Sequence, residues 1–277
     1  MMLRVDAHQH FWAVARGDYG WMESSPSLAP IRRDFIPNDY EEFRTRYNIE
    51  RTVLVQAAPS IEETEYMLGL ADATPWIAKV VGWVDFEDRS HRRHLERLAR
   101  HGKFSGVRPM IQDIADIDWM LRPDVQWGYD AICALDLTFD ALGFPRHLGN
   151  FRRLFDRYPK MRVVIDHCLK PEIRNQSFDA WAAGIAEIAA KTPVYCKLSG
   201  LATEAESDWK VAALRPYAEH VIGSFGANRV MWGSDWPVIN LAGGFDAWRQ
   251  AAEEIVGNAA ARDRIFGGNA AEFYRIT

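Results

Sequence analysis

Eight short apolar runs recur along the chain, separated by longer stretches of mixed polarity. Several of the runs are nearly continuous in apolar residues, which is typical of strands that are buried on both faces of a parallel sheet. We therefore predict eight strands, at Leu3–Phe11, Arg51–Ala57, Ala78–Phe86, Ser105–Ile111, Leu137–Phe144, Arg162–Leu169, Val194–Leu201 and Arg229–Trp236.

The stretches between these runs have the signals of amphipathic helices. Asn38 stands three residues before Glu41, and Ser60 three before Glu63, so each pair predicts a capping box at a helix start. The stretch that leads to Gly102 predicts a helix with this glycine as its left-handed C′ residue. Further helices with one apolar face are predicted at His147–Tyr158, Ser177–Lys191, Asp208–Phe225 and Phe245–Val256.

The regular alternation of strand and helix predicts an α/β fold, a (β/α)₈ TIM barrel formed by a single domain over residues 1–277. A doubly wound sheet is the alternative, because alternation alone does not show whether the last strand pairs with the first. Residues 13–37 lack periodicity and contain Gly17, Gly20, Pro26 and Pro30. This segment is therefore predicted to be a long first βα loop that covers the site.

Composition narrows the kind of protein. The 277 residues are 48% hydrophobic with a formal net charge of −5, so nothing indicates the basic surface that nucleic acid or anionic lipid requires. No apolar run has the length of a membrane span, and no signal-peptide pattern stands at the amino terminus. Three widely spaced cysteines do not form a disulfide framework, which favours a reducing compartment. We expect a cytoplasmic protein that binds neither nucleic acid nor membranes.

Polar residues stand near the carboxyl ends of three predicted strands. Asp6, His8 and His10 alternate along the first strand and are predicted to share its inward face. His167 lies near the end of the sixth strand, and Asp235 near the end of the eighth, which neighbours the first in a closed barrel. Active sites of such barrels lie at this end of the strands. Three imidazoles and a carboxylate there predict a catalytic or metal-binding site, because burying them without a role is costly.

Four further residues are candidates for substrate binding. Arg108 in the fourth strand could bind a hydroxyl or carboxylate oxygen through its forked guanidinium group, with a surface ion pair as the alternative. Gln56, at the end of the second strand, is a candidate for a hydrogen bond to a sugar hydroxyl group. Trp83 and Trp236 are candidates for pocket walls, because aromatic faces suit the apolar side of a sugar ring, although large aromatic residues are more often core.

Strand alternation also orients the neighbours of His167. Asp166 and Cys168 are predicted to point away from it, so that Asp166 is structural and Cys168 is no nucleophile. Lys197 lies in the seventh strand, and its run does not fix which face it occupies.

Several motifs together resemble a known superfamily. They are Val5–Trp12 (VDAHQHFW), Ile165–His167 (IDH), Gly233–Pro237 (GSDWP), Gly268–Ala271 (GNAA) and Cys196–Ala205 (CKLSGLATEA). This set resembles the amidohydrolase superfamily, and within it the lactonase branch that includes L-fuconolactonase, L-rhamnonolactonase and 2-pyrone-4,6-dicarboxylate lactonase. The last of the five motifs looks particularly like the sugar-lactone members.

The resemblance implies a carboxylic ester hydrolase that opens a sugar-acid lactone of the L-fucono- or L-rhamnono- type. It implies Asp235 as general base and His167 as a catalytic group that orients the water or the carbonyl group. At most one divalent ion, Zn²⁺ or Mn²⁺, is implied, held by His8, His10 and Asp235, with His167 as a further candidate ligand. A bridging ligand for a second ion is missing, because the fourth strand offers Arg108 and the fifth has no histidine. The branch also includes members that work without a metal.

Other functions stay open at this stage. One is a hydrolase of a dicarboxylate lactone of the 2-pyrone-4,6-dicarboxylate type. Binding such a substrate would require two or three cationic groups, whereas the sequence offers Arg108. Another is a metal-dependent decarboxylase of the same superfamily, and a third is a barrel that binds a sugar acid without catalysis. The expected partner is a small lactone, and assembly into a homo-oligomer is left open.

Overall fold

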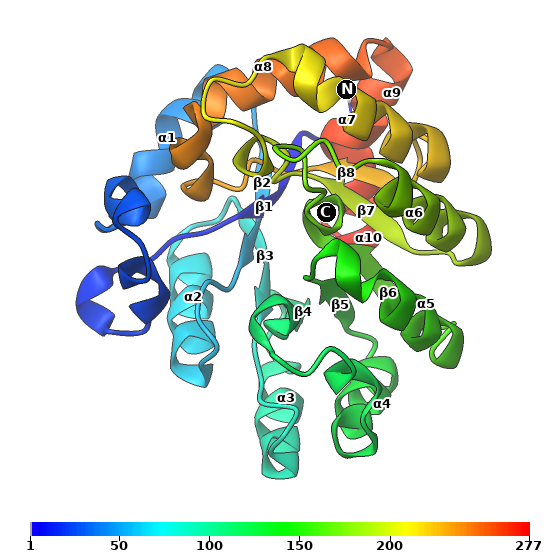
Figure 1. The fold of residues 1–277 in the computed structure, drawn as a ribbon. Helices are drawn as coiled ribbons and strands as arrows, with labels where there is room; N and C mark the ends of the chain where they lie inside the picture. The colour runs from blue at the N-terminus through cyan, green and yellow to red at the C-terminus, as the bar shows by residue number, and fades with distance from the viewer. Residues whose placement is uncertain (1) are drawn as a thin grey trace.

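Eight parallel strands stand side by side in chain order in the computed structural model, which describes residues 2–277 (Figure 1). The strands are β1 (Val5–Gln9), β2 (Arg51–Val55), β3 (Ile77–Gly82), β4 (Phe104–Val107), β5 (Thr138–Ala141), β6 (Arg162–Ile165), β7 (Tyr195–Leu198) and β8 (Val230–Trp232). Most are shorter than their apolar runs. Gln56 directly follows β2, Arg108 follows β4 and Asp166 follows β6, so the polar residues of these runs lie just beyond the sheet.

The sheet closes where the segment after β8 meets β1. The His10 N–H donates to the Trp236 carbonyl oxygen over 2.7 Å, and the Asp235 N–H donates to the His8 carbonyl oxygen over 2.8 Å. A doubly wound sheet has two open edges, whereas here the first and last strands are joined. The predicted (β/α)₈ barrel is therefore confirmed, and the doubly wound alternative is wrong.

Helices surround the strands, while α10 lies inside this ring of helices and packs against the inner core of the barrel (Figure 1). The helices are α1 (Pro37–Arg46), α2 (Ile61–Ala73), α3 (Arg92–Leu98), α4 (Gln126–Ala134), α5 (Leu148–Arg157), α6 (Asp179–Lys191), α7 (Val211–Phe225), α8 (Gly244–Val256), α9 (Ala259–Asp263) and α10 (Asn269–Tyr274). The apolar faces predicted for α5 and α6 are buried, with Phe151 and Leu154 on the first and Trp181 and Ile185 on the second.

The barrel has two hydrophobic cores. The inner core contains valines of several strands, such as Val53, Val81 and Val164, and is completed by Phe273 and Tyr274 of α10. A larger outer core lies between the strands and the surrounding helices. The inner core fills the barrel below the site, so the polar groups at the carboxyl ends of the strands rest on a packed base.

Helix starts and ends differ from two of the sequence predictions. At α1 the Asp39 carboxylate accepts the Ile36 N–H over 2.9 Å, so the box predicted at Asn38 and Glu41 is wrong by two positions. Ser60 caps α2 as predicted, accepting the Glu63 N–H over 3.0 Å. The prediction of a left-handed Gly102 is wrong. Helix α3 ends earlier, at Leu98, and N–H groups of the following turns already bond to the last carbonyl groups of α3.

The segment of residues 13–37 folds into three short 3₁₀ turns, at Val14–Arg16, Gly20–Glu23 and Pro26–Ile31. Its two ends are joined, because Trp12 and Phe35 exchange backbone hydrogen bonds of 2.9 Å in both directions. The Arg16 guanidinium group lies 4.5 Å from the centre of the Tyr66 ring on α2, which fastens the loop to the barrel.

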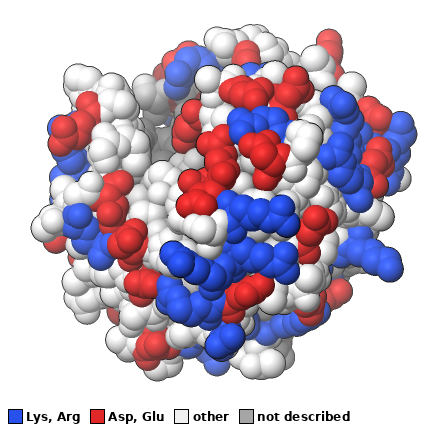
Figure 2. Space-filling view, turned by 90° about the horizontal axis from the view of Figure 1, so that it is seen from below, with Lys and Arg blue, Asp and Glu red and all other residues white. Residues whose placement is uncertain are grey.

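Charged side chains of both signs are interspersed on the face seen from below, where a group of basic side chains is bordered by acidic ones (Figure 2). Several arginines of the lower helices are paired, for example Arg92 with Glu96 on α3 and Arg97 of α3 with Glu65 of α2. Within residues 2–277, none of the helices combines the length and the apolar character that crossing a membrane requires.

Candidate active site

His8 and His10 reach the site from β1, but Asp6 does not. The pairing of β1 with β2 shifts register between Asp6 and Gln9, so two-residue alternation fails across this stretch. The Asp6 carboxylate accepts the Tyr40 hydroxyl group of α1 over 2.6 Å and the Ser234 N–H over 2.9 Å. The predicted common face of Asp6, His8 and His10 is therefore wrong for Asp6, which joins β1 to α1 and to the segment after β8.

Asp166 and His167 both face the site, although they are neighbours in sequence. The strand ends at Ile165, and the next residues leave the extended conformation, with a φ angle of 52° at His167. The Asp166 carboxylate lies 3.5 Å from His8 Nδ1 and 3.4 Å from Arg108 Nη1. The prediction that Asp166 points away is therefore wrong. Cys168 does point away, with its Sγ donating to the Lys197 carbonyl oxygen over 3.3 Å.

Asp235 is placed by the segment that follows β8. Gly233 allows this segment to approach β1, because a Cβ atom at this position would lie 2.6 Å from His8 Cβ. Asp235 itself is left-handed, with a φ angle of 57°, a conformation that aspartate and asparagine tolerate better than most residues. The backbone bond from Asp235 to the His8 carbonyl then fixes the carboxylate beside the imidazoles.

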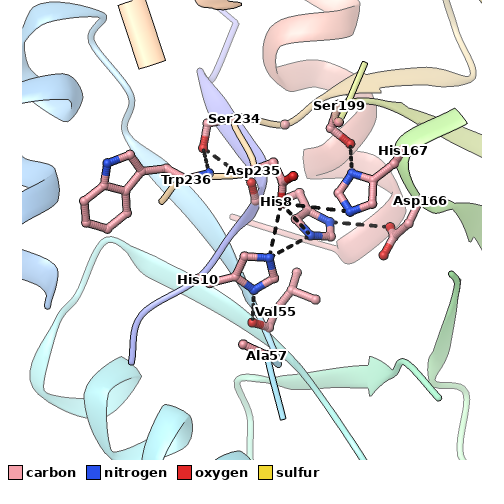
Figure 3. Close-up of polar contacts among 12 residues, drawn as sticks. His8, His10, Val55, Ala57, Asp166, His167, Ser199, Ser234, Asp235 and Trp236 are labelled. Carbon is pink, nitrogen blue, oxygen red and sulfur yellow. Dashed lines mark hydrogen bonds and ion pairs between the residues drawn. The ribbon is translucent and has the colours of Figure 1, made fainter. Parts of the chain in front are cut away.

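The predicted set of four side chains converges in the structure (Figure 3). Asp235 Oδ1 lies 3.3 Å from His10 Nε2, 3.7 Å from His8 Nε2 and 3.9 Å from His167 Nε2. The Nε2 atoms of His8 and His10 are 3.2 Å apart. All four side chains are almost fully buried. One carboxylate oxygen therefore faces three ring nitrogens at the barrel mouth.

Hydrogen bonds on the far side of the rings fix their orientation. His10 Nδ1 lies 2.7 Å from the Val55 carbonyl oxygen, which can only accept, so the proton is on Nδ1 and Nε2 faces Asp235 as an acceptor. His167 Nδ1 lies 2.9 Å from Ser199 Oγ. Gly200 allows this contact, because a Cβ atom there would lie 2.7 Å from the His167 ring.

Burial and charge set the protonation states. Burial lowers the pKa of His8 and of His167 well below the usual value of 6.5, so both rings are neutral near pH 7. For Asp235, burial acts to raise the pKa, but the neighbouring His167, His10 and Lys170 outweigh it, and the net shift is downward. The expectation that burial raises this pKa is therefore wrong, and Asp235 is a stable carboxylate.

A buried lysine lies directly beneath His8. Lys197 Nζ donates to Asp140 Oδ2 over 2.6 Å, lies 3.0 Å from Asp166 Oδ1 and is 3.1 Å from His8 Nδ1. The Tyr274 hydroxyl group also donates to Asp140, over 2.7 Å. The structure thus settles the facing of Lys197, which is inward. An ammonium group that donates to His8 Nδ1 leaves the proton of this ring on Nε2, directed at the site.

His10, His167 and Asp235 form one wall of a pocket of about 290 Å³, and His8 lies fully buried behind them. Trp12, Trp21 and Ser24 come from the first loop and its entry, and they form another wall. The remaining lining residues are Ala57, Arg108, Met110, Gln112, Asp113, Leu142, Lys170 and Val238. The pocket therefore combines an aromatic side with polar and charged groups, as a sugar-like ligand requires.

Of the four predicted substrate-binding residues, only Arg108 lines this pocket. It is buried, donating to the Gln56 carbonyl oxygen, so the surface ion pair is wrong. Gln56 donates through Nε2 to the Arg108 carbonyl oxygen over 2.7 Å and supports the arginine. Trp83 lies against His91. Trp236 is directed away from the imidazoles into the outer core (Figure 3), so neither tryptophan is a pocket wall.

The sequence predictions did not include four residues that line the pocket or support it from below. Trp12 follows His10 by two residues, and this spacing could have indicated it. Trp21 and Lys170 lie in irregular segments, where periodicity says nothing about direction. Asp140 is in β5, and its partner Lys197 was visible as a charged residue in an apolar run.

The structure also predicts a pH-dependent stability. Glu63 of α2 accepts the Ala57 and Ala58 N–H groups, which holds the pocket-lining end of the β2–α2 loop. Burial raises the pKa of Glu63 from 4.5 to about 7. The folded protein therefore retains a proton that the unfolded chain releases, and stability falls as the pH rises from 4.5 to about 7. Between pH 5 and pH 8, the free energy of unfolding measured by urea denaturation should fall less for Glu63→Gln than for wild type. We expect the difference to reach up to about 3 kcal/mol.

Glu65 provides the matched control for this experiment, since it lies on the same helix and is exposed. Glu65→Gln should leave the pH dependence of wild type unchanged. Equal pH dependence in Glu63→Gln and wild type would contradict the role assigned to burial.

The donor set fits one divalent ion. Ligand atoms of His8, His167 and Asp235 lie within 4.8 Å of one another, and the His10 Nε2 lone pair faces the same carboxylate. Imidazole and carboxylate donors suit Zn²⁺ or Mn²⁺. The Lys197 ammonium group lies beneath these donor atoms. It provides the positive charge between the Asp140 and Asp166 carboxylates.

Comparisons with known proteins identify the family of this chain. The sequence pattern of the amidohydrolase family matches residues 5–276. The L-fucono-1,5-lactonase of Burkholderia ambifaria is 46% identical, over 100% of this chain and 97% of the relative. That of Burkholderia multivorans is 34% identical, over 99% of this chain and 96% of the relative. A crystal structure of a Burkholderia multivorans amidohydrolase with bound zinc has a TM-score of 0.93 and 32% identity, covering 99% of this chain and 100% of that chain.

Proposed function

This chain belongs to the amidohydrolase family, and on that premise we propose that it is a hydrolase that opens sugar-acid lactones of the L-fucono- or L-rhamnono- type. The observation that supports this function best is the Asp235 carboxylate, which faces three imidazoles at the base of a pocket with one aromatic side. The chain is also 46% identical over its full length to an L-fucono-1,5-lactonase.

Asp235 acts as the general base. Its carboxylate takes a proton from a water molecule while the water oxygen attacks the acyl carbon of the lactone. Because Asp235 has a lowered pKa, it is a weak base, and positioning must supply much of the acceleration. His10 Nε2 accepts the second hydrogen of this water, and His167 Nε2, on the far side of the same carboxylate oxygen, helps to orient it.

His8 is fully buried and does not line the pocket, so it acts on the reacting groups through Asp235. Lys197 donates to its Nδ1 atom, so that the Nε2 proton is directed at Asp235 Oδ1, 3.7 Å away, and holds this carboxylate in place. When the ring C–O bond breaks, protonated Asp235 returns its proton to the leaving oxygen. A divalent ion would be held by His8, His10, His167 and Asp235, and His8 would then carry its proton on Nδ1, which lies 3.5 Å from Asp166 Oδ1. The ion would supply Lewis-acid polarisation and a more acidic water.

The structure strengthens one alternative. Lys170 lines the pocket together with Arg108, so two cationic groups are present where the sequence indicated one. A dicarboxylate lactone could use both. Asp113 and Asp235 line the same pocket and offset this positive charge, which favours a neutral sugar lactone.

A lactone panel tests the proposal. We expect the purified protein to hydrolyse L-fuconolactone or L-rhamnonolactone with a kcat/KM at least about 100-fold above that for 2-pyrone-4,6-dicarboxylate, since a site built for hydroxyl groups discriminates strongly. Acid release measured with a pH indicator reports all three reactions. If only the dicarboxylate is opened, the sugar assignment is wrong. A cytoplasmic location, a role in carbohydrate catabolism and a homo-oligomeric state stay predictions.

A further inference from the structure

Four consecutive residues after β6 adopt the left-handed conformation, with φ angles of 52° at His167, 53° at Cys168, 55° at Leu169 and 47° at Lys170. None of them is glycine, and each such residue costs roughly 1–2 kcal/mol relative to the right-handed form. The Lys170 N–H donates to the His167 carbonyl oxygen over 2.7 Å, closing a left-handed turn. Such strain persists where function requires it.

The turn delivers two side chains to the same pocket. His167 and Lys170 are three residues apart and both line it, whereas Cys168 and Leu169 between them pack into the outer core. A right-handed turn would change the directions of all four side chains. The strained backbone therefore brings Lys170 close to the groups around Asp235.

The Lys170 ammonium group has no carboxylate partner. Its Nζ atom donates to the neutral amide oxygen of Gln112 over 2.7 Å and lies 5.4 Å from the centre of the Phe144 ring. Over residues 2–277, no carboxylate oxygen lies within the 4.0 Å of an ion pair with it. Arg108, the other cation of the pocket, is already engaged with Asp166 and with the Gln56 carbonyl oxygen.

We propose that Lys170 is the anion-binding residue of this site, which holds the acyl oxygen atoms as they become negative and then the carboxylate group of the opened sugar acid. This inference rests on the proposed lactone hydrolysis. Lys170 thereby adds a binding role to the pocket beyond the imidazoles and Asp235.

The balance of the reaction explains why such a cation is needed. The water oxygen forms a bond to the acyl carbon, the ring C–O bond breaks, and one water proton reaches the leaving oxygen through Asp235. The second water proton departs when the new carboxylic acid ionises. A neutral ligand thus becomes an anion beside the Asp235 carboxylate, and a nearby ammonium group offsets the repulsion between the two.

Binding measurements separate charge from shape. Calorimetric titration should be carried out with two ligands. L-Fuconate is the opened acid, and L-fucitol is a neutral polyol of the same carbon skeleton. Lys170→Met should weaken L-fuconate binding about tenfold or more, as loss of a half-buried charge-assisted contact does, and leave L-fucitol within about twofold. Lys170→Arg, which keeps the charge, should retain most of the L-fuconate affinity. Lys210→Met, at an exposed lysine, is the matched control and should change neither ligand.

Kinetics provide a second measurement. Because the lactone is neutral, Lys170→Met should lower kcat more than it raises KM. Unchanged L-fuconate affinity in Lys170→Met, or an equal loss for both ligands, would overturn the inference, and so would a wild-type protein that does not prefer L-fuconate to L-fucitol. If L-fuconate binding depends on Lys170 but no lactone is hydrolysed, the proposed function fails while this site stands.

Discussion

Asp235→Asn should lower kcat for lactone hydrolysis by about 10³-fold or more while leaving the fold intact. The amide group cannot take a proton from water, and it also removes the negative charge that faces His8, His10 and His167. Asparagine is well suited to this test. It has the size of aspartate and tolerates the left-handed conformation found at this position, whereas alanine would add strain.

The measurements are steady-state kinetics and a thermal melt of the same preparations. The melting temperature of Asp235→Asn should stay close to that of wild type, because the substitution removes a buried charge without opening a cavity. Asp208→Asn, at an exposed aspartate, controls for the amide substitution and should retain full activity. An Asp235→Asn variant whose kcat lies within tenfold of wild type would refute the general-base role.

Lys197→Met should destabilise the protein by about 3–5 kcal/mol, which is typical when one partner of a buried ion pair is removed. The lysine is fully buried and holds Asp140 and Asp166 together beneath His8. Methionine fills similar space but provides no donor. Two carboxylates would then face each other in the inner barrel without a counter-charge, and urea denaturation measures the loss.

The pH dependence distinguishes this charge effect from poor packing. Burial already raises the pKa of Asp140, and without the lysine both carboxyl groups should have raised pKa values. Acids with raised pKa values regain stability as the pH falls and they become protonated. The loss of stability of Lys197→Met relative to wild type should therefore become smaller at low pH. Lys191→Met, at an exposed lysine paired with Glu187, should change stability by about 0.5 kcal/mol or less. A deficit that is the same at every pH would favour packing instead.

The strand-end motifs predicted the core of the site. His8, His10, His167 and Asp235 were identified from their positions after apolar runs, and the barrel brings them together because β8 and β1 are neighbours. The family resemblance came from the motifs around these residues and from two further motifs, and its limit of one metal ion came from the fourth and fifth strands, which offer Arg108 and no histidine. These features depend on the order of the strands, which the pattern of apolar runs records directly.

The sequence did not predict correctly where side chains at irregular strand positions and beyond the strand ends point. Two-residue alternation placed Asp6 inward and Asp166 outward, and both predictions were wrong. A register shift in β1 and the left-handed turn after β6 change the direction of the backbone there. Aromatic character alone predicted Trp83 and Trp236 as pocket walls, whereas the tryptophans that line the pocket are Trp12 and Trp21.

The sequence by itself determined the eight strands in their order, the α/β class and the four residues that converge at the barrel mouth, because burial imposes a periodic pattern that survives in the linear chain. Only the tertiary structure decided the closure of the barrel, the inward direction of Lys197 and Asp166, and the entry of Lys170 into the pocket. For the turn that carries Lys170, the physical reason is that a left-handed conformation in residues other than glycine is unfavourable locally. It is maintained by packing and hydrogen bonds from distant parts of the chain, such as the contact between His167 and Ser199, which no local pattern encodes.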